Sequence, residues 1–198
     1  MAKIISDERV WLETLQPGFT YQDCVIMWDN SVSKLENVSF INCTFQEFDF
    51  TDFELLNVTF ENCDLSALHF NNAEMHDTHF QFVKLLDTEF LHTTHNKTNF
   101  NDCVMNNAKF SNSHFKQSTF DKCELKETAF NSVILNIIEF NYCQLHHTNF
   151  TDTSLNGLDV STCEFDTLQI DAENTKGLII RKDQSNSILG ALGIQFIS

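Results

Sequence analysis

The chain is poor in the residues that globular domains use for turns. Its 198 residues include one proline and five glycines, and tryptophan and tyrosine occur only twice each. Ordinary domains build their turns largely from glycine and proline, so the turns here must depend on other residues. Phenylalanine, in contrast, occurs 20 times. A composition with one dominant aromatic residue and few turn formers is typical of an internal repeat.

Basic residues are also scarce. Twelve lysines and arginines face 28 acidic side chains, which gives a formal net charge of −16. A surface this negative repels nucleic acid and anionic lipid, so the sequence predicts no direct binding to either. A protein partner is expected to be basic.

Long apolar runs and export signals are missing as well. No stretch approaches the ~18 apolar residues that a membrane span needs. The first nine residues, Met1 to Arg9, reach charged side chains before an apolar run can form, so no signal peptide is expected. Seven cysteines, an odd number, favour reduced thiols. Together these features predict a cytoplasmic protein.

The sequence lacks the patterns that carry catalysis or metal binding. It contains no CxxC pair, no glycine-rich phosphate loop and no Ser–His–Asp set that stands out. His92 and His95 are three residues apart, but they fall on different positions of the repeat described below, which argues against a shared metal. The sequence therefore predicts no catalytic residue, no metal site and no cofactor, and we expect the protein not to be an enzyme.

An unbroken five-residue repeat runs through the middle of the chain. From Phe40 to Ile170, every fifth residue gives 27 positions, of which 26 are apolar and 15 are phenylalanine. A second column, two residues upstream, holds mostly Cys, Thr, Val, Ala and Ser and carries no charge. A period of five fits neither an amphipathic helix nor a simple strand. It indicates a chain that turns a corner every five residues and points the large residue at an axis.

A second period of twenty indicates four sides per coil. Six cysteines are separated by multiples of twenty residues, and only Val83 interrupts their column: Cys43, Cys63, Cys103, Cys123, Cys143 and Cys163. Coils that stack at the strand spacing of ~4.8 Å place these identical residues in ladders. We therefore interpret the cysteines as small core residues. His95 occupies a large core position, and we expect it to be a hydrogen-bonded or partly everted core histidine.

These repeats resemble the pentapeptide-repeat family. The resemblance is carried by units such as Cys63-Asp64-Leu65-Ser66-Ala67 and Ala108-Lys109-Phe110-Ser111-Asn112, and it extends over residues 38–172. It implies an all-β fold, a right-handed quadrilateral parallel β-helix, with a short C-terminal helix. The stretch from Phe19 to Ile26 is interpreted as one more turn in a shifted register.

Three segments are predicted. Residues 1–17 form an N-terminal cap, residues 18–180 form the β-helix with its regular register over 38–172, and residues 181–198 form a C-terminal helix and dimerisation tail. A solenoid has to cover its open ends, because exposed edges invite stacking. The apolar C-terminal segment either only plugs the last coil or also pairs two molecules. The residues predicted to form a homodimer are Ile188, Leu189, Leu192, Ile194 and Phe196.

The acidic residues are unevenly spread. Between Lys34 and Lys84 there are nine acidic residues and no basic one, and eight more follow from Glu127 to Glu173. These carboxylates either form a solubility coat or present phosphate-like charge to a DNA-binding surface. Under the second hypothesis, the residues predicted to bind the partner are Glu47, Asp49, Asp52, Glu54, Glu61, Asp64, Glu74 and Asp77.

The closing Ile188-Leu189 and Leu192-Gly193-Ile194 resemble the C-terminus of the quinolone-resistance subgroup, which includes Qnr-type and MfpA-type proteins. That resemblance implies a DNA mimic that binds DNA gyrase or topoisomerase IV and protects it from antibiotics such as quinolones. Qnr-type proteins interrupt the repeat with two loops, and residues 38–172 contain no insertion. The alternatives are a non-catalytic scaffold or interaction module, or a toxin-immunity factor, without a topoisomerase role.

Overall fold

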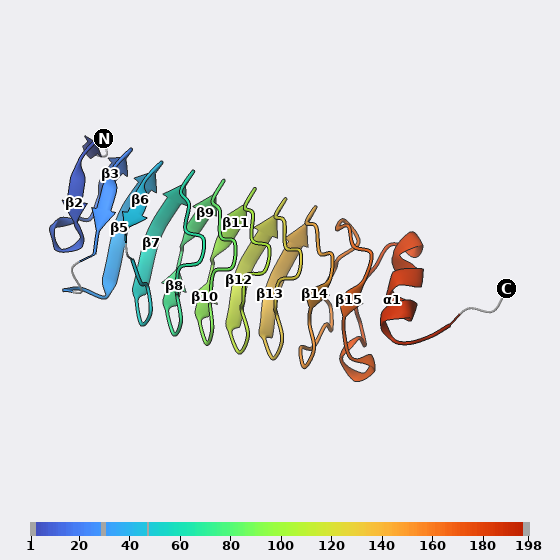
Figure 1. Ribbon diagram of the computed structural model, residues 1–198. Coiled ribbons are helices and arrows are strands. Elements are labelled where there is room, and N and C mark those ends of the chain that lie inside the picture. Colours follow the sequence, from blue (N-terminus) through green and yellow to red (C-terminus); the bar gives the residue numbers. More distant parts are fainter. Residues whose placement is uncertain (1–2, 29–30, 47, 196–198) are drawn as a thin grey trace.

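The structure is a computed structural model, and it describes residues 3–28, 31–46 and 48–195. The chain winds as a right-handed parallel β-helix into a rod, with strands β1 and β3 at one end and helix α1 at the other (Figure 1). This confirms the fold class predicted from the repeat. None of the helices in the described part of the chain has the length and apolarity to cross a membrane.

Most strands are short, because the chain turns a corner every five residues. The first group runs along the N-terminal half of the rod: β1 (Lys3–Ser6), β2 (Arg9–Trp11), β3 (Phe19–Gln22), β4 (Val25–Met27), β5 (Lys34–Ile41), β6 (Thr44–Gln46), β7 (Glu54–Glu61), β8 (Glu74–His76) and β9 (His79–Gln81). The second group completes it: β10 (Thr94–Asn96), β11 (Asn99–Asn101), β12 (His114–Asp121), β13 (Ile134–Asn141), β14 (Thr148–Asn149) and β15 (Leu168–Gln169).

The strands pair in parallel from coil to coil. The largest sheet has ten strands in the order β1-β3-β5-β7-β8-β10-β12-β11-β9, with β13 paired to β12 and β7 paired also to β9. Its register advances by twenty residues per coil, as in Phe40 opposite Phe60 and Phe100 opposite Phe120. This is the four-sided coil that the cysteine spacing predicts.

Four ladders of large residues fill the rod, and we name the sides after them. The first side carries Phe40 and its successors, the second Phe45, the third Phe50 and the fourth Leu55. Rings within a ladder stack, with centroids 4.7 Å apart for Phe100 and Phe120. Rings on opposite sides meet edge to face, at 6.0 Å and 77° for Phe100 and Phe110. Both geometries suit the aromatic quadrupole.

The corners explain how the chain turns with so few glycines. From Leu35 to Leu155, the described residue two places after each large core residue has positive φ, as in Asn62 at 53° and Asn72 at 59°. Asn and Asp tolerate this left-handed conformation best among residues with a side chain. They occupy many of the corners, which accounts for the frequency of Asn and Asp at this repeat position.

The first coils are shorter than the rest. Ile5 lies opposite Tyr21, sixteen residues on, and Tyr21 lies opposite Phe40, nineteen residues on. The second pairing confirms the shifted register expected for Phe19 to Ile26. The N-terminal segment predicted as a cap contains β1, β2 and the 3₁₀ turn η1 (Leu12–Thr14), and so continues the β-helix as its terminal coil.

The other end of the rod is closed by polar and apolar contacts together. After η2 (Ala172–Asn174) and η3 (Lys182–Gln184), helix α1 (Ser185–Ala191) crosses the last coil. Gln184 donates from Nε2 to the carbonyl oxygens of Val160 and Cys163, at 3.1 and 2.8 Å. These bonds satisfy backbone acceptors that the end of a solenoid would leave open. The predicted C-terminal helix is confirmed.

The cysteines are buried free thiols within the core, as the repeat predicts. The Cys103 Sγ donates to the carbonyl oxygen of Phe80 at 3.4 Å, and Cys123 repeats the contact with Phe100 at 3.3 Å. Burial raises the pKa of the Cys43 thiol to about 12 and that of Cys63 to about 11. Thiols held protonated in this way are poor nucleophiles and poor metal ligands.

His95 is fully buried, so the partly everted alternative is wrong and the hydrogen-bonded one is confirmed. Its Nε2 lies 2.8 Å from the Thr93 hydroxyl, which in turn donates to the Ser113 hydroxyl at 2.9 Å. Its ring stacks on Phe115 with centroids 4.2 Å apart. Desolvation by burial lowers the pKa of His95 to about 3.

The five-residue register predicts a large contrast between neighbouring positions. Phe100→Ala or Phe110→Ala should lower the free energy of unfolding by about 3–5 kcal/mol, since each side chain is fully buried. The control Asn101→Ala, next to Phe100 on the outer face, should cost under ~0.5 kcal/mol. Equal costs in urea unfolding would contradict the assigned core.

Because His95 is buried, we expect the free energy of unfolding to fall in acid. Because its folded pKa, about 3, lies below the ~6.5 of the unfolded chain, the unfolded state binds the proton first. The contribution of His95 is present above pH ~6.5 and is lost as the pH falls toward the folded pKa. Relative to His95→Phe, the wild type should lose about 2.5 kcal/mol between pH 7 and pH 4.5. Parallel pH profiles of unfolding free energy would contradict this assignment.

Candidate functional site

The predicted partner-binding carboxylates do not share one face. The five-residue turn sends successive residues around the rod, so a run in the sequence becomes a ring in space. Glu61 lies on the first side, Asp64 on the second, and Asp77 at the corner between the fourth and the first. Asp77 is also 3.9 Å from Lys97, which offsets its charge. Glu47 lies outside the described residues.

Four of the predicted residues do come together, and we call them the acidic edge: Asp49, Asp52, Glu54 and Glu74. They lie along the border between the third and fourth sides. Glu54 and Glu74 are ladder neighbours on β7 and β8, so their backbones are separated by one coil spacing of ~4.8 Å. Two adjoining surface hollows of about 420 Å³ each follow this border.

Short hydrogen bonds hold two of these carboxylates. The Thr51 backbone N–H donates to Asp49 Oδ1 at 2.8 Å, and Asn72 Nδ2 donates to Asp52 Oδ1 at 3.0 Å. Both contacts leave further lone pairs of the carboxylates free to accept. Asp49 and Asp52 are therefore held in place and can still accept hydrogen bonds from a partner.

One cation borders the acidic edge. Lys34 Nζ lies 3.4 Å from Glu54 and 3.5 Å from Glu36, and all three side chains are about half exposed. Exposed ion pairs of this kind contribute little, about 0–1 kcal/mol each. Lys34 reduces the negative potential without cancelling it, because the acidic edge carries four carboxylates and Lys34 is a single ammonium group.

In the middle of the rod, an acidic side chain is instead paired with basic side chains of the neighbouring coils. On the third side, Glu89 lies 2.9 Å from Lys109 of the next coil and 3.1 Å from His69 of the previous one. The hydrogen bond from Lys109 lowers the pKa of Glu89 below its usual range, with a further contribution from Asn71. A carboxylate with its partners already in place has little to offer another protein, which separates this ladder from the acidic edge.

The predicted dimerisation residues divide into two groups. Ile188 is only 8% exposed and packs in the core, and Leu192 also contacts the core. Both therefore serve to plug the last coil. Leu189 is half-buried without joining that core, and Ile194 is 49% exposed. Phe196 lies outside the described residues.

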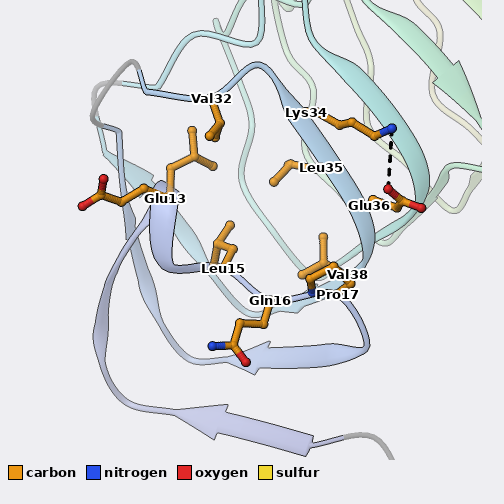
Figure 2. Close-up of a pocket in the computed structure, with 10 residues that line it drawn as sticks. Glu13, Leu15, Gln16, Pro17, Val32, Lys34, Leu35, Glu36 and Val38 are labelled. Atoms are coloured by element: carbon orange, nitrogen blue, oxygen red, sulfur yellow. Dashed lines mark ion pairs between the residues drawn. The ribbon is translucent and has the colours of Figure 1, made fainter.

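A separate apolar hollow of about 250 Å³ lies near the N-terminal end (Figure 2). It lies between residues 12–17 and residues 32–38. Leu12, Leu15 and Leu35 line it, and the ion-paired Lys34 and Glu36 border it. It brings together no set of groups suited to chemistry. Among the described residues, no cluster of three potential metal ligands is found.

One exposed apolar group was missed at the sequence level. Ile134, Ile137 and Tyr142 are 55%, 66% and 66% exposed on or beside β13. Their signal was present in the sequence, because they occupy three of the outward repeat positions that elsewhere hold mostly polar residues.

Comparison with known proteins agrees with this architecture. The family model for the pentapeptide repeat region matches residues 53–130 and 73–150. No curated protein sequence matches the chain.

Among solved structures, full-length QnrB1, described as a plasmid-mediated fluoroquinolone resistance protein, is similar at 16% identity with a TM-score of 0.50 over 98% of both chains. The pentapeptide-repeat protein Rfr23 from the cyanobacterium Cyanothece 51142 is similar at 11% identity and a TM-score of 0.38, over 66% of this chain and 89% of its own. At such identities the likeness bears on the fold alone.

Proposed function

This chain belongs to the pentapeptide-repeat family, and on that premise we propose that it is a non-catalytic, cytoplasmic DNA mimic that binds DNA gyrase or topoisomerase IV. By occupying the DNA-binding surface it would protect the enzyme from antibiotics such as quinolones. The observation that carries the proposal is the acidic edge, an ordered row of carboxylates on a rigid rod with a net charge of −16.

The physics of such binding is that of DNA itself. Duplex DNA carries one phosphate per ~3.4 Å along each strand, and ladder positions on the rod repeat every ~4.8 Å. The spacings are of the same order, so a basic groove that binds phosphates can meet carboxylates on this edge. Clustered charge also steers association and makes affinity depend on salt.

Rigidity favours the same function. Each coil is held by backbone hydrogen bonds and stacked rings, so the carboxylates need little ordering when they bind. A flexible acidic tail would have to lose that entropy on binding. The rod therefore suits presentation of charge in a fixed row better than a disordered polyanion would.

The proposal predicts that charge reversal at the acidic edge, and not elsewhere on the rod, abolishes gyrase binding and protection. Asp49→Lys, Asp52→Lys, Glu54→Lys and Glu74→Lys together should abolish gyrase binding and protection of supercoiling against ciprofloxacin. The matched control reverses four carboxylates on or beside the second side: Asp87, Asp102, Glu124 and Glu127. Each set changes four charges from −1 to +1, which shifts the formal net charge from −16 to −8.

Supercoiling and binding assays with purified gyrase separate the alternatives. We expect the control to keep protection, wild-type binding to weaken steeply with salt, and duplex DNA to compete. Equal loss in both variants would point to net charge alone. Full binding by both would leave the acidic edge as a solubility coat and favour a scaffold role.

We propose further that two molecules pair through the C-terminal segment. The exposed Ile194 and the half-buried Leu189 are five residues apart in sequence at the end of the rod, and their 2.9 Å backbone bond, from Ile194 N–H to the Leu189 carbonyl, keeps them close. Sedimentation at ~10 μM should show a dimer that Leu189→Asp with Ile194→Asp converts to monomer. The control Phe82→Asp, at an exposed corner elsewhere, should remain dimeric. A monomeric wild type would refute this assembly.

A further inference from the structure

The β-helix is split at one corner. Strands β5, β7 and β12 pair with a neighbour on both flanks, whereas β13 pairs only with β12. Toward the C-terminal end, no backbone hydrogen bond joins residues 134–141 to residues 154–161, a region that the structure describes completely. The next coil pair is joined again, for example by Val160 N–H to the Ile179 carbonyl at 3.0 Å.

A side-chain contact marks the far end of the split. In a regular coil, the N–H of the corresponding corner residue donates to a backbone carbonyl, as Asp102 does to Asp121 at 2.9 Å. At the split, Tyr142 N–H donates instead to the Thr162 hydroxyl at 3.2 Å. The coils are thus displaced enough that a side chain has to bridge them.

The small column changes in size at the split. The earlier residues of this ladder are Val38, Val58, Thr78, Thr98 and Ser118, and the strands that carry or adjoin them pair from coil to coil. They are followed by Ile138 and Leu158, which are larger and meet at the same corner.

The split exposes apolar surface on a strained backbone. Ile137 has φ of 55° and is 66% exposed, at a corner where the preceding residues of the ladder are all polar: Asn37, Asn57, Asp77, Lys97 and Gln117. A β-branched residue is costly in this conformation. Strain that is retained where a polar residue would relieve it is a feature of functional positions.

A hollow of about 100 Å³ opens beside Ile137, lined by Leu135, Ile138 and Leu158 together with small or polar neighbours. This volume suits one aliphatic side chain. Glu139 and Asp159 are exposed on the two sides of the split, and the sequence from 128 to 175 contains no lysine or arginine. The surroundings of the hollow are therefore negative.

From these observations we infer that the split corner is a docking site for an extended segment of a partner protein. The segment places one aliphatic side chain in the hollow and basic side chains against Glu139 and Asp159. The acidic edge includes none of these residues, so this inference does not depend on topoisomerase binding.

The test uses a defined probe and a matched pair of variants. The probe is a fluorescein-labelled, amidated peptide of sequence Lys-Val-Lys-Leu-Lys-Val-Lys, followed by fluorescence polarisation against the full-length protein. Ile137→Asn restores the corner residue of the same ladder and should keep or raise the melting temperature. We expect it to weaken peptide binding about tenfold or more, as loss of one buried aliphatic contact does.

Phe82→Asn is the control, because Phe82 is an exposed corner residue with φ of 54° whose backbone bond to Asn101 is intact. It should leave peptide binding unchanged. Glu139→Lys with Asp159→Lys should also weaken binding, as should glutamate in place of every lysine of the peptide. No saturable binding, or equal binding by wild type and Ile137→Asn, would overturn the inference. A change of oligomeric state in Ile137→Asn would overturn it too, since a second copy would then be the occupant.

Discussion

The structure depends on a large apolar side chain arriving at the rod axis every fifth residue. Each such residue stacks on its equivalents in the coils before and after, so one ladder position is stabilised from two directions. The backbone can satisfy this only by turning sharply between contacts, which requires a left-handed residue at each corner. Core ladders and corner asparagines are therefore two aspects of one constraint. Residues at outward positions are not subject to this constraint, so they can vary for solubility or recognition.

That separation explains which features the sequence could predict. The ladders, the cysteine column and the four-sided coil follow from spacing alone, because inward positions recur without insertion from Phe40 to Ile170. The acidic site is different, since its neighbours are set by a period of twenty. Glu61 and Asp64 are near Glu54 in sequence and lie on other sides of the rod, while Glu74, a full coil away, lies beside it. Carboxylates that are close together in the sequence therefore lie around the rod, and only some of them meet at the acidic edge.

The split corner was also visible in principle. Ile138 stands in a column that otherwise favours small residues, but the column as a whole is variable enough to hide it. The residue one coil further on is Leu158, and both side chains line the hollow at the split. Large residues in this column do not by themselves separate coils, because Leu158 and Leu178 are also successive and their coils are joined by the Ile179 N–H to the Leu158 carbonyl at 2.8 Å. The split is local, because the coils rejoin within one turn.

The buried Thr93–His95–Ser113 contact helps a periodic sequence to stack its coils in the correct order. When every coil resembles the next, a chain that threads one coil out of phase still buries phenylalanine on phenylalanine, and little distinguishes it from the correct topology. Thr93 finds its hydroxyl partner only if Ser113 lies directly above it. A slip of twenty residues would put Val133 there instead, and the buried Thr93 N–H, which donates to the Ser113 hydroxyl at 2.9 Å, would lose its acceptor at a cost of about 1–3 kcal/mol. The Thr93–His95–Ser113 contact therefore determines which coil stacks on which, whereas the repeated apolar ladders do not.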